Sequence, residues 1–124
     1  MAIFHPANLA MQILASTLRD QPFTPALRPP TDIYRTRDGW LIKMELAGVC
    51  KDDIDVSVEG GLLCVRGCRR DTHQCHGSEY HRLEISYSSF QRQIELPCDL
   101  SRARMELDSH DGMLLIQIFP ENSP

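Results

Sequence analysis

The sequence has none of the short motifs that mark the common kinds of catalytic site. Gly-x-Ser-x-Gly, the glycine-rich phosphate loop and His-Glu-x-x-His are all missing from its 124 residues. Asp52, Asp53 and Asp55 form an acidic group, but they lie at the entry to a predicted strand, where alternation turns such side chains outward. Gly60-Gly61 precedes a strand-like run rather than a helix, so it predicts a turn and not a phosphate cradle. We therefore predict that the chain is not an enzyme and uses no cofactor.

The sequence also lacks an excess of positive charge and any long apolar run. Its net charge is −4, whereas nucleic-acid-binding proteins usually carry a basic excess. No segment approaches the roughly 20 apolar residues of a membrane span. No Lys or Arg precedes the apolar start of the chain, so we expect no signal peptide. These observations predict a cytoplasmic protein with no nucleic-acid partner and no membrane partner.

The cysteines form no paired framework, since their number is odd. We expect free thiols in a reducing cytoplasm. The five are Cys50, Cys64, Cys68, Cys75 and Cys98. Thiolate and imidazole side chains suit Zn²⁺, and three cysteines and two histidines lie in or beside a single predicted loop. That group comprises Cys64, Cys68, His73, Cys75 and His76. It contains no paired Cys-x-x-Cys, so we predict incidental thiols and no bound metal, with a metal or redox role as the alternative.

The first 30 residues differ in character from the rest of the chain. Apolar residues at helical spacing predict a short amphipathic helix near the start. They are Ala7, Met11, Leu14 and Leu18. Four prolines then predict an extended linker, because none of them fits inside a continuous helix. They are Pro22, Pro25, Pro29 and Pro30.

From residue 31 onward the apolar period changes from that of a helix to that of a strand. Two hairpins are predicted, one around Gly60-Gly61 and one around Asp111-Gly112, because both pairs tolerate the positive φ of a tight turn. Short strands, regular turns and the lack of a long helix predict an all-β fold, an antiparallel β-sandwich. We divide the chain into an arm with its linker (1–30), a sandwich domain (31–120) and a short tail (121–124).

Several segments together resemble the small heat shock proteins, the Hsp20 or α-crystallin domain family of bacterial type. The run from Phe90 to Pro97 resembles the family pattern Phe-x-Arg-x-Ile-x-Leu-Pro, and Asp111-Gly112-Met113-Leu114 resembles Asp/Asn-Gly-x-Leu. Further matches, in the family's order, are Pro30–Tyr34, Leu46–Val49, Lys51–Ile54, Leu63–Gly67, Tyr80–Glu84 and Tyr87–Phe90. The resemblance covers about residues 30–120. It implies an immunoglobulin-like sandwich and an ATP-independent chaperone, a holdase that binds unfolding client proteins.

The resemblance also implies a homodimer formed by strand exchange. A long loop from Cys68 to Ser89 would carry the segment Tyr80–Leu83 onto an edge strand of the partner, at Asp32–Thr36. A loop of this length is uncommon in a compact domain unless it has a function. The implied dimer residues are Asp32, Ile33, Tyr34, Tyr80, His81, Arg82, Leu83 and Arg92. For Arg92 the alternative is a solvent-facing arginine of little energetic consequence.

Two apolar surfaces are candidates for binding clients. The resemblance implies a groove between the strands at 54–59 and 104–108, lined by Val56, Val58, Met105 and Leu107. The alternative is that these four are ordinary core residues. The arm offers Ile3, Phe4, Leu9, Met11, Ile13, Leu14, Leu18 and Phe23. Exposed apolar surface usually marks a contact site, and the alternative is that the arm packs permanently on its own domain or another subunit.

The family's assembly motif, an Ile-x-Ile near the C-terminus, has one match here. Ile116-Gln117-Ile118 lies inside the last predicted strand, where alternation is explained by core packing. We therefore predict a homodimer and leave larger oligomers open. The second functional hypothesis is a co-chaperone or adaptor of the related CS/p23 type that docks on one specific partner. The third is a metal- or redox-regulated binding module.

Overall fold

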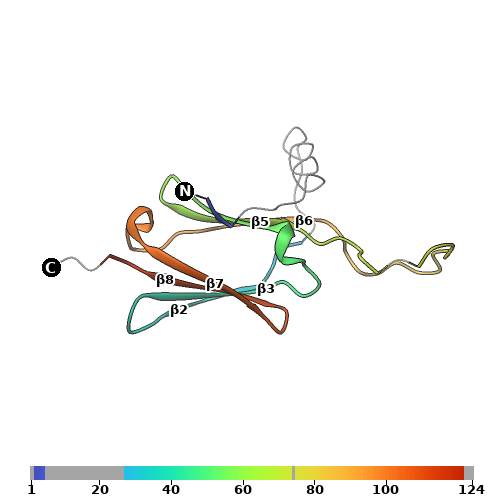
Figure 1. The fold of residues 1–124 in the computed structure, drawn as a ribbon, viewed down its shortest axis with the longest axis horizontal. Helices are drawn as coiled ribbons and strands as arrows, with labels where there is room; N and C mark the ends of the chain where they lie inside the picture. Colours follow the sequence, from blue (N-terminus) through green and yellow to red (C-terminus); the bar gives the residue numbers. More distant parts are fainter. Residues whose placement is uncertain (1, 5–26, 74, 122–124) are drawn as a thin grey trace.

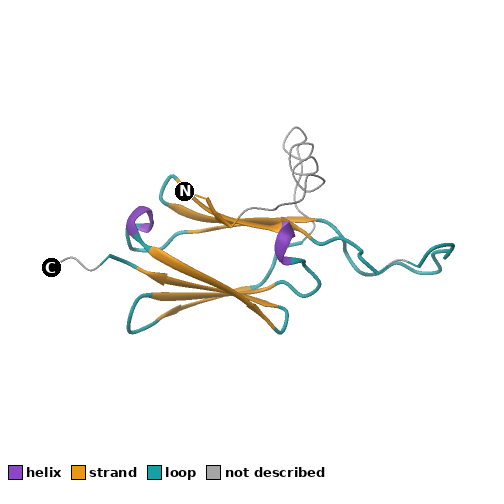
Figure 2. Cartoon of the chain, viewed as in Figure 1, coloured by secondary structure: helices purple, strands orange, loops and turns teal. Residues whose placement is uncertain are grey.

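The protein is a sandwich of two four-stranded antiparallel sheets (Figure 1). The computed structural model describes residues 2–4, 27–73 and 75–121. The strands are β1 (Ala2–Phe4), β2 (Thr31–Arg35), β3 (Trp40–Glu45), β4 (Ile54–Glu59), β5 (Leu62–Cys68), β6 (Ser89–Ile94), β7 (Arg104–His110) and β8 (Met113–Phe119). Two one-turn 3₁₀ helices, η1 (Lys51–Asp53) and η2 (Leu100–Arg102), complete the elements (Figure 2). The predicted antiparallel β-sandwich is therefore confirmed, whereas the predicted arm helix lies outside the described residues.

The two sheets have the strand orders β1-β4-β5-β6 and β2-β3-β8-β7. Every second residue of the central strands faces the other sheet, as a half-buried strand requires. On β3, for example, Ile42 and Met44 are fully buried while Lys43 between them is not. The core between the sheets consists of Ile42, Met44, Leu46, Ile54, Val56, Leu63, Val65, Phe90, Ile94, Leu96, Leu100, Leu114, Ile116 and Ile118. Each of these aliphatic or aromatic side chains contributes about 1.5–3 kcal/mol when fully buried.

Both predicted hairpins are present. Gly60 and Gly61 have φ values of 59° and 80°, and they join β4 to β5. Asp111 and Gly112 have φ values of 51° and 77°, and they join β7 to β8. Two successive positive φ values are typical of the type I′ turn, whose twist matches that of the flanking strands. The turn residues thus determine where each antiparallel pair begins.

Gly67 allows two segments of the core to approach the β5 backbone closely. It lies opposite Ile54 on β4 and Phe90 on β6. A Cβ at this position would lie 2.4 Å from Phe90 Cζ and 2.5 Å from the carbonyl oxygen of Asp53. The oxygen belongs to the backbone, so a larger residue would force the chain itself to move. Glycine is therefore a packing requirement here.

We expect Gly67→Ala to lower the free energy of unfolding by about 1–3 kcal/mol, the usual penalty for overpacking a core. Urea unfolding followed by circular dichroism measures this change. Gln93→Ala is the matched control, because Gln93 is exposed on the adjacent strand β6 and its loss should cost less than about 0.5 kcal/mol. Equal stability of Gly67→Ala and wild type would contradict the packing argument.

A long connection, from Arg69 to Ser88, links β5 to β6 and projects from the sandwich (Figures 1 and 2). We call it the exchange loop. Its bounds differ by one residue at each end from those of the predicted loop, Cys68 to Ser89. The described residues include no helix that is long and apolar enough to cross a membrane.

Candidate functional site

Exposed apolar side chains gather on two segments of the described structure. One segment is β2, where Ile33 is 46% exposed and Tyr34 is also exposed. The other is the exchange loop, where Leu83 is 67% exposed. Within the described ranges, the exposed large apolar residues are Ile33, Tyr34, Tyr80, Leu83, Ile85 and Tyr87. Four of them, Ile33, Tyr34, Tyr80 and Leu83, are among the predicted dimer residues, and Ile85 and Tyr87 lie on the same loop.

Among the described residues, β2 is an edge strand that pairs only with β3. Asp32 and Tyr34 lie on the outer face, where the Tyr34 hydroxyl donates to Asp32 Oδ2 at 3.3 Å. Lys43, opposite Asp32 on β3, places its Nζ 5.2 Å from the centre of the Tyr34 ring. Ile33 lies on the inner face, opposite the buried Ile42. The outer face of β2 is therefore polar, whereas its inner face carries Ile33, which its own chain buries only in part.

Arg69 closes the base of the exchange loop. Its backbone N–H donates to the Ser88 carbonyl at 3.0 Å, which continues the pairing of β5 with β6 by one step. Its Nε and Nη2 both donate to the Ser86 carbonyl, at 2.9 and 2.7 Å. Its Nη1 donates to the Ala47 carbonyl at 3.3 Å. One guanidinium thus ties the outgoing and returning segments of the loop to the turn after β3.

Arg70 ties the same loop to the interior of the sandwich. Its Nε donates to Asp53 Oδ2 at 2.8 Å, and the Asp53 side chain is only 1% exposed. The buried carboxylate raises the pKa of Arg70 and so favours its charged form. A carboxylate at this depth requires such a partner, because burying an unpaired charge is costly.

The expectation that Asp53 points outward is wrong. Asp53 is the last residue of η1, and its N–H donates to the Cys50 carbonyl at 2.9 Å. Strand alternation begins only at Ile54, so Asp53 and Ile54 are both buried. Sequence reasoning also missed Arg69 and Arg70. The available signal was a pair of adjacent arginines at the point where an apolar strand becomes a polar loop.

We expect Arg70→Ala to lower the free energy of unfolding by about 1–3 kcal/mol, because it leaves the Asp53 carboxylate buried without its partner. Urea unfolding at neutral pH measures the change. Arg102→Ala is the control, since Arg102 is largely exposed and its ion contacts with described residues are long, at 4.0 and 3.6 Å. A loss no larger than that of the control would contradict a stabilising role for the Asp53–Arg70 pair.

Two of the four residues predicted to line a groove share one cavity. It has a volume of about 190 Å³ and brings together Val58 on β4 and Met105 on β7. Its other lining residues are Gly60, Gly61, Leu100, Ser101 and Ala103. Val56 does not line this cavity, because it is fully buried in the core. Leu107 is half buried and packs against the core, as Val58 and Met105 do, but it does not line this cavity.

The start of the arm lies on the edge of β4. β1 pairs antiparallel with β4, with Ala2 opposite Ser57 and Phe4 opposite Val56. The backbone of the candidate residues Ile3 and Phe4 therefore belongs to the sandwich. The remaining arm candidates, Leu9, Met11, Ile13, Leu14, Leu18 and Phe23, lie outside the described residues.

Arg92 contacts the segment that leads into β2. It is half buried on β6, and its Nη1 donates to the Pro29 carbonyl at 2.8 Å. Burial lowers the pKa of Arg92, and the positive charge of nearby Arg28 lowers it further. Pro29 O also accepts a hydrogen bond from the Thr31 hydroxyl at 3.0 Å. Arg92 thus joins one sheet to the beginning of the other within a single chain.

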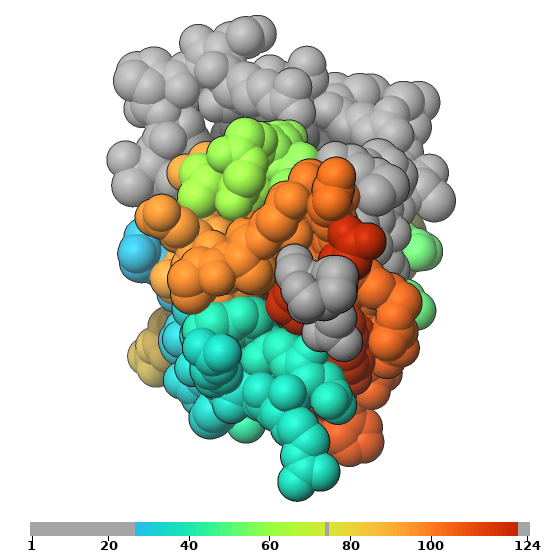
Figure 3. All heavy atoms as spheres, turned by 90° about the vertical axis from the view of Figure 1, so that its left-hand side faces the viewer, coloured from blue at the N-terminus to red at the C-terminus, as the bar shows by residue number. Residues whose placement is uncertain are grey.

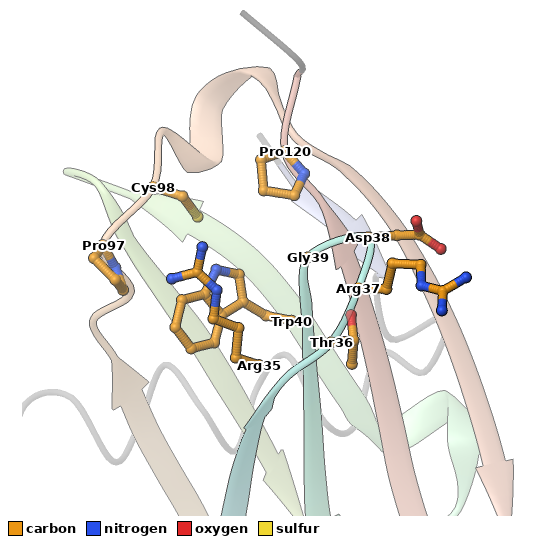
Figure 4. A pocket seen from close by; sticks show the side chains of 9 residues that line it. All are labelled: Arg35, Thr36, Arg37, Asp38, Gly39, Trp40, Pro97, Cys98 and Pro120. Carbon is orange, nitrogen blue, oxygen red and sulfur yellow. The ribbon is translucent and has the colours of Figure 1, made fainter.

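A second cavity, of about 320 Å³, lies at the turn between β2 and β3. Figure 4 shows Arg35 lying against Trp40 beside Pro97 and Cys98, while Arg37 and Asp38 point away from them. The Arg35 guanidinium carbon is 5.5 Å from the centre of the Trp40 ring, a cation–π arrangement. Figure 3 shows this end of the molecule, where the turn meets the segment after β6 and the end of β8.

The cysteines and histidines of the alternative hypothesis do not converge. Within residues 2–4, 27–73 and 75–121, no group of three or more His, Cys, Asp or Glu side chains is arranged to hold a metal ion. Cys64 and Cys68 are buried, and burial is the main reason that their pKa values are raised. Both thiols are therefore protonated at neutral pH, which disfavours nucleophilic or redox chemistry.

We expect Cys50 and Cys75, which are exposed, to be alkylated by iodoacetamide at least about tenfold faster at pH 8 than Cys64 and Cys68. The raised pKa values of the buried pair leave little thiolate, and burial blocks access. Mass spectrometry of the quenched protein follows each site. Simultaneous labelling of all five thiols in the folded protein would contradict this assignment.

Comparison with known proteins places this sandwich in a family. The Hsp20/alpha crystallin family model matches residues 32–124. "Small heat shock protein C2" of Rickettsia felis is 33% identical over 92 residues, which covers 74% of this chain and 60% of that protein. The "22.0 kDa heat shock protein" of Arabidopsis thaliana is 33% identical over 95 residues, which covers 75% of this chain and 49% of that protein. The chain belongs to the Hsp20/alpha crystallin family.

Solved structures agree with this assignment. Heat shock protein 16.0 from Schizosaccharomyces pombe superposes with a TM-score of 0.67 at 25% identity, covering 77% of this chain and 88% of that chain. A small heat-shock protein from Xylella fastidiosa superposes with a TM-score of 0.63 at 25% identity, covering 79% and 90%. Along the sequence, the chain spans only 49–60% of the length of the curated relatives named above. Membership of a family of small heat shock proteins implies a chaperone role, and such proteins are generally not enzymes.

Proposed function

We propose that this protein is an ATP-independent holdase that binds partly unfolded client proteins and limits their aggregation under stress. The observation that carries the proposal is the match of residues 32–124 to the Hsp20/alpha crystallin family, in a sandwich with a cavity lined by Val58 and Met105 that the dimer surface does not use. Accessible apolar surface of this kind usually marks an interaction site. The expected location is the cytoplasm, and the expected partners are clients and further copies of the chain rather than nucleic acid or membrane.

The dimer is proposed to form by strand exchange between two copies. The exchange loop extends away from the sandwich and carries Tyr80–Leu83 outward (Figure 1). β2 offers an open edge with Asp32, Ile33 and Tyr34 exposed along it. An added strand would satisfy the backbone groups of that edge and cover Ile33. Arg92 contributes indirectly, because its bond to Pro29 fixes the chain just before β2.

Clients are proposed to bind the arm and the groove. The arm carries apolar residues along Ile3–Phe23, and burial of each aliphatic side chain contributes about 1.5–3 kcal/mol. The groove offers Val58 and Met105, in the cavity between the two sheets. Both surfaces would replace contacts between client molecules with contacts to the chaperone, which needs no nucleotide. Val56, being fully buried, has no part in this proposal.

Light scattering from a heat-labile client tests the holdase, with the reduced protein added at increasing ratios without nucleotide. We expect suppression at near-stoichiometric ratios. Replacing Leu9, Leu14 and Leu18 by serine should raise the ratio required by at least about tenfold, because the loss of even one buried leucine removes about 1.4 kcal/mol or more of binding free energy. Asn8→Ala with Gln12→Ala is the matched control in the same arm and should behave as wild type.

The possible results lead to different conclusions. Unchecked aggregation with the wild-type protein would overturn the holdase and favour the co-chaperone or adaptor hypothesis, which a search for one stoichiometric partner would then address. Suppression that survives the serine substitutions would keep the holdase and remove these three arm residues from the client-binding surface.

A further inference from the structure

We propose that the exchanged segment pairs with β2 of a second copy in one antiparallel register, with Arg82 opposite Asp32 and Glu79 opposite Arg35. This inference rests on the proposed strand-exchange dimer and adds the pairing that specifies it. It follows from the two faces of β2, the alternation of the loop residues and the charges on both segments.

The faces of β2 are fixed by its pairing with β3. Ile33 lies opposite the buried Ile42, and Arg35 lies opposite Trp40, so both are on the inner face. Asp32 lies opposite Lys43 and is therefore on the outer face. A strand added to the other side of β2 shares these faces, because directly opposite residues point to the same side of a sheet.

The alternation of the exchanged segment limits the registers. In an extended strand, Glu79, His81 and Leu83 share one face, while Tyr80 and Arg82 share the other. Leu83 is 67% exposed in the single chain and Ile33 is 46% exposed, so both gain burial when Leu83 turns to the inner face. The odd-numbered residues of the segment must then match the odd-numbered residues of β2. A slip by one residue turns Leu83 to the outer face and places either Arg82 or Tyr80 against Ile33, depending on its direction.

Charge selects one register from those that remain. With Arg82 opposite Asp32, Glu79 falls opposite Arg35, so both cross-strand pairs have opposite signs, and Leu83 lies diagonal to Ile33. A slip by two residues in one direction places Glu84 opposite Asp32, a pair of like charges. A slip by two in the other direction places Glu79 against Ile33. Of these three registers, only the proposed one satisfies both the charges and the apolar face.

The single chain leaves these charges available for a partner. Arg82 approaches Glu84 with an Nε–Oε1 distance of 3.8 Å, and both side chains are about three-quarters exposed, at 75% and 76%. Such an exposed pair contributes little and is easily exchanged. Arg35 lies against the Trp40 ring at the far end of the same edge. A parallel strand with Arg82 opposite Asp32 would instead bring Ile85 to Arg35, so the second pair distinguishes the two directions.

Charge reversal provides the test, with assembly measured by sedimentation velocity. Asp32→Lys and Arg82→Glu, each purified alone, should raise the dimer dissociation constant by at least about tenfold, since every dimer then contains two like-charged pairs. Mixing the two variants should restore wild-type affinity as a heterodimer, which native mass spectrometry identifies. Arg35→Glu and Glu79→Lys should behave in the same way as a second complementary pair.

Two controls separate pairing from folding. Arg37→Glu reverses an exposed charge beyond the proposed pairing and should leave dimerisation unchanged. Asp32→Lys also faces Lys43 within its own chain, but rescue by Arg82→Glu in another chain cannot arise from that contact. Circular dichroism of each variant checks that the sandwich remains folded.

The outcomes also separate this inference from the proposed function. If the single variants dimerise as well as wild type, the register is wrong, and aggregation suppression by the wild type still supports the holdase. Rescue of the Asp32 and Arg82 pair without rescue of the Arg35 and Glu79 pair would overturn the antiparallel direction. A monomeric wild type would overturn the exchange dimer itself. Full rescue without holdase activity would establish the register and reject the holdase.

Discussion

The backbone edges of the two sheets are the constraint on which this structure depends. An edge strand presents N–H and C=O groups that either pair with another strand or invite one. β1 covers the edge of β4, and Leu27 forms a bridge with Phe90 on β6. β7 is an edge that carries exposed charged residues such as Glu106 and Asp108, a common protection against unwanted pairing. β2, with Ile33 and Tyr34 exposed, is the edge most suited to receive a strand.

Two adjacent arginines with separate partners hold the base of the exchange loop against the sandwich. Arg69 bonds to backbone carbonyls on both sides of the loop base, whereas Arg70 reaches the buried carboxylate of Asp53. Neighbouring side chains in an extended segment point in opposite directions, so the two arginines can bind two different parts of the sandwich, the Ala47 carbonyl and the Asp53 carboxylate. The loop can therefore leave the domain in a defined direction while its outer part remains open to another chain.

The two predicted client-binding surfaces, the groove and the arm, differ in how much of each is part of the sandwich. Val58 and Met105 line a cavity between the sheets, whereas Val56 belongs entirely to the core. The first residues of the arm are already paired with β4, beside the strand that supplies Val58. This part of the arm is thus a structural strand, and client binding by the arm, as proposed, rests on the residues that follow it.

The sequence by itself determined the features that depend on local patterns. Alternation from Trp40 to Glu45 predicts a half-buried strand, and Gly60-Gly61 and Asp111-Gly112 predict hairpins, because side-chain period and positive φ are properties of a few consecutive residues. The family motifs also gave the edge strand and the long loop. Tertiary structure alone decided the burial of Asp53, its pairing with Arg70 and the position of β1 on β4. These contacts join residues far apart in the chain, so their energies depend on which segments the packed sheets bring together, and no local pattern records that.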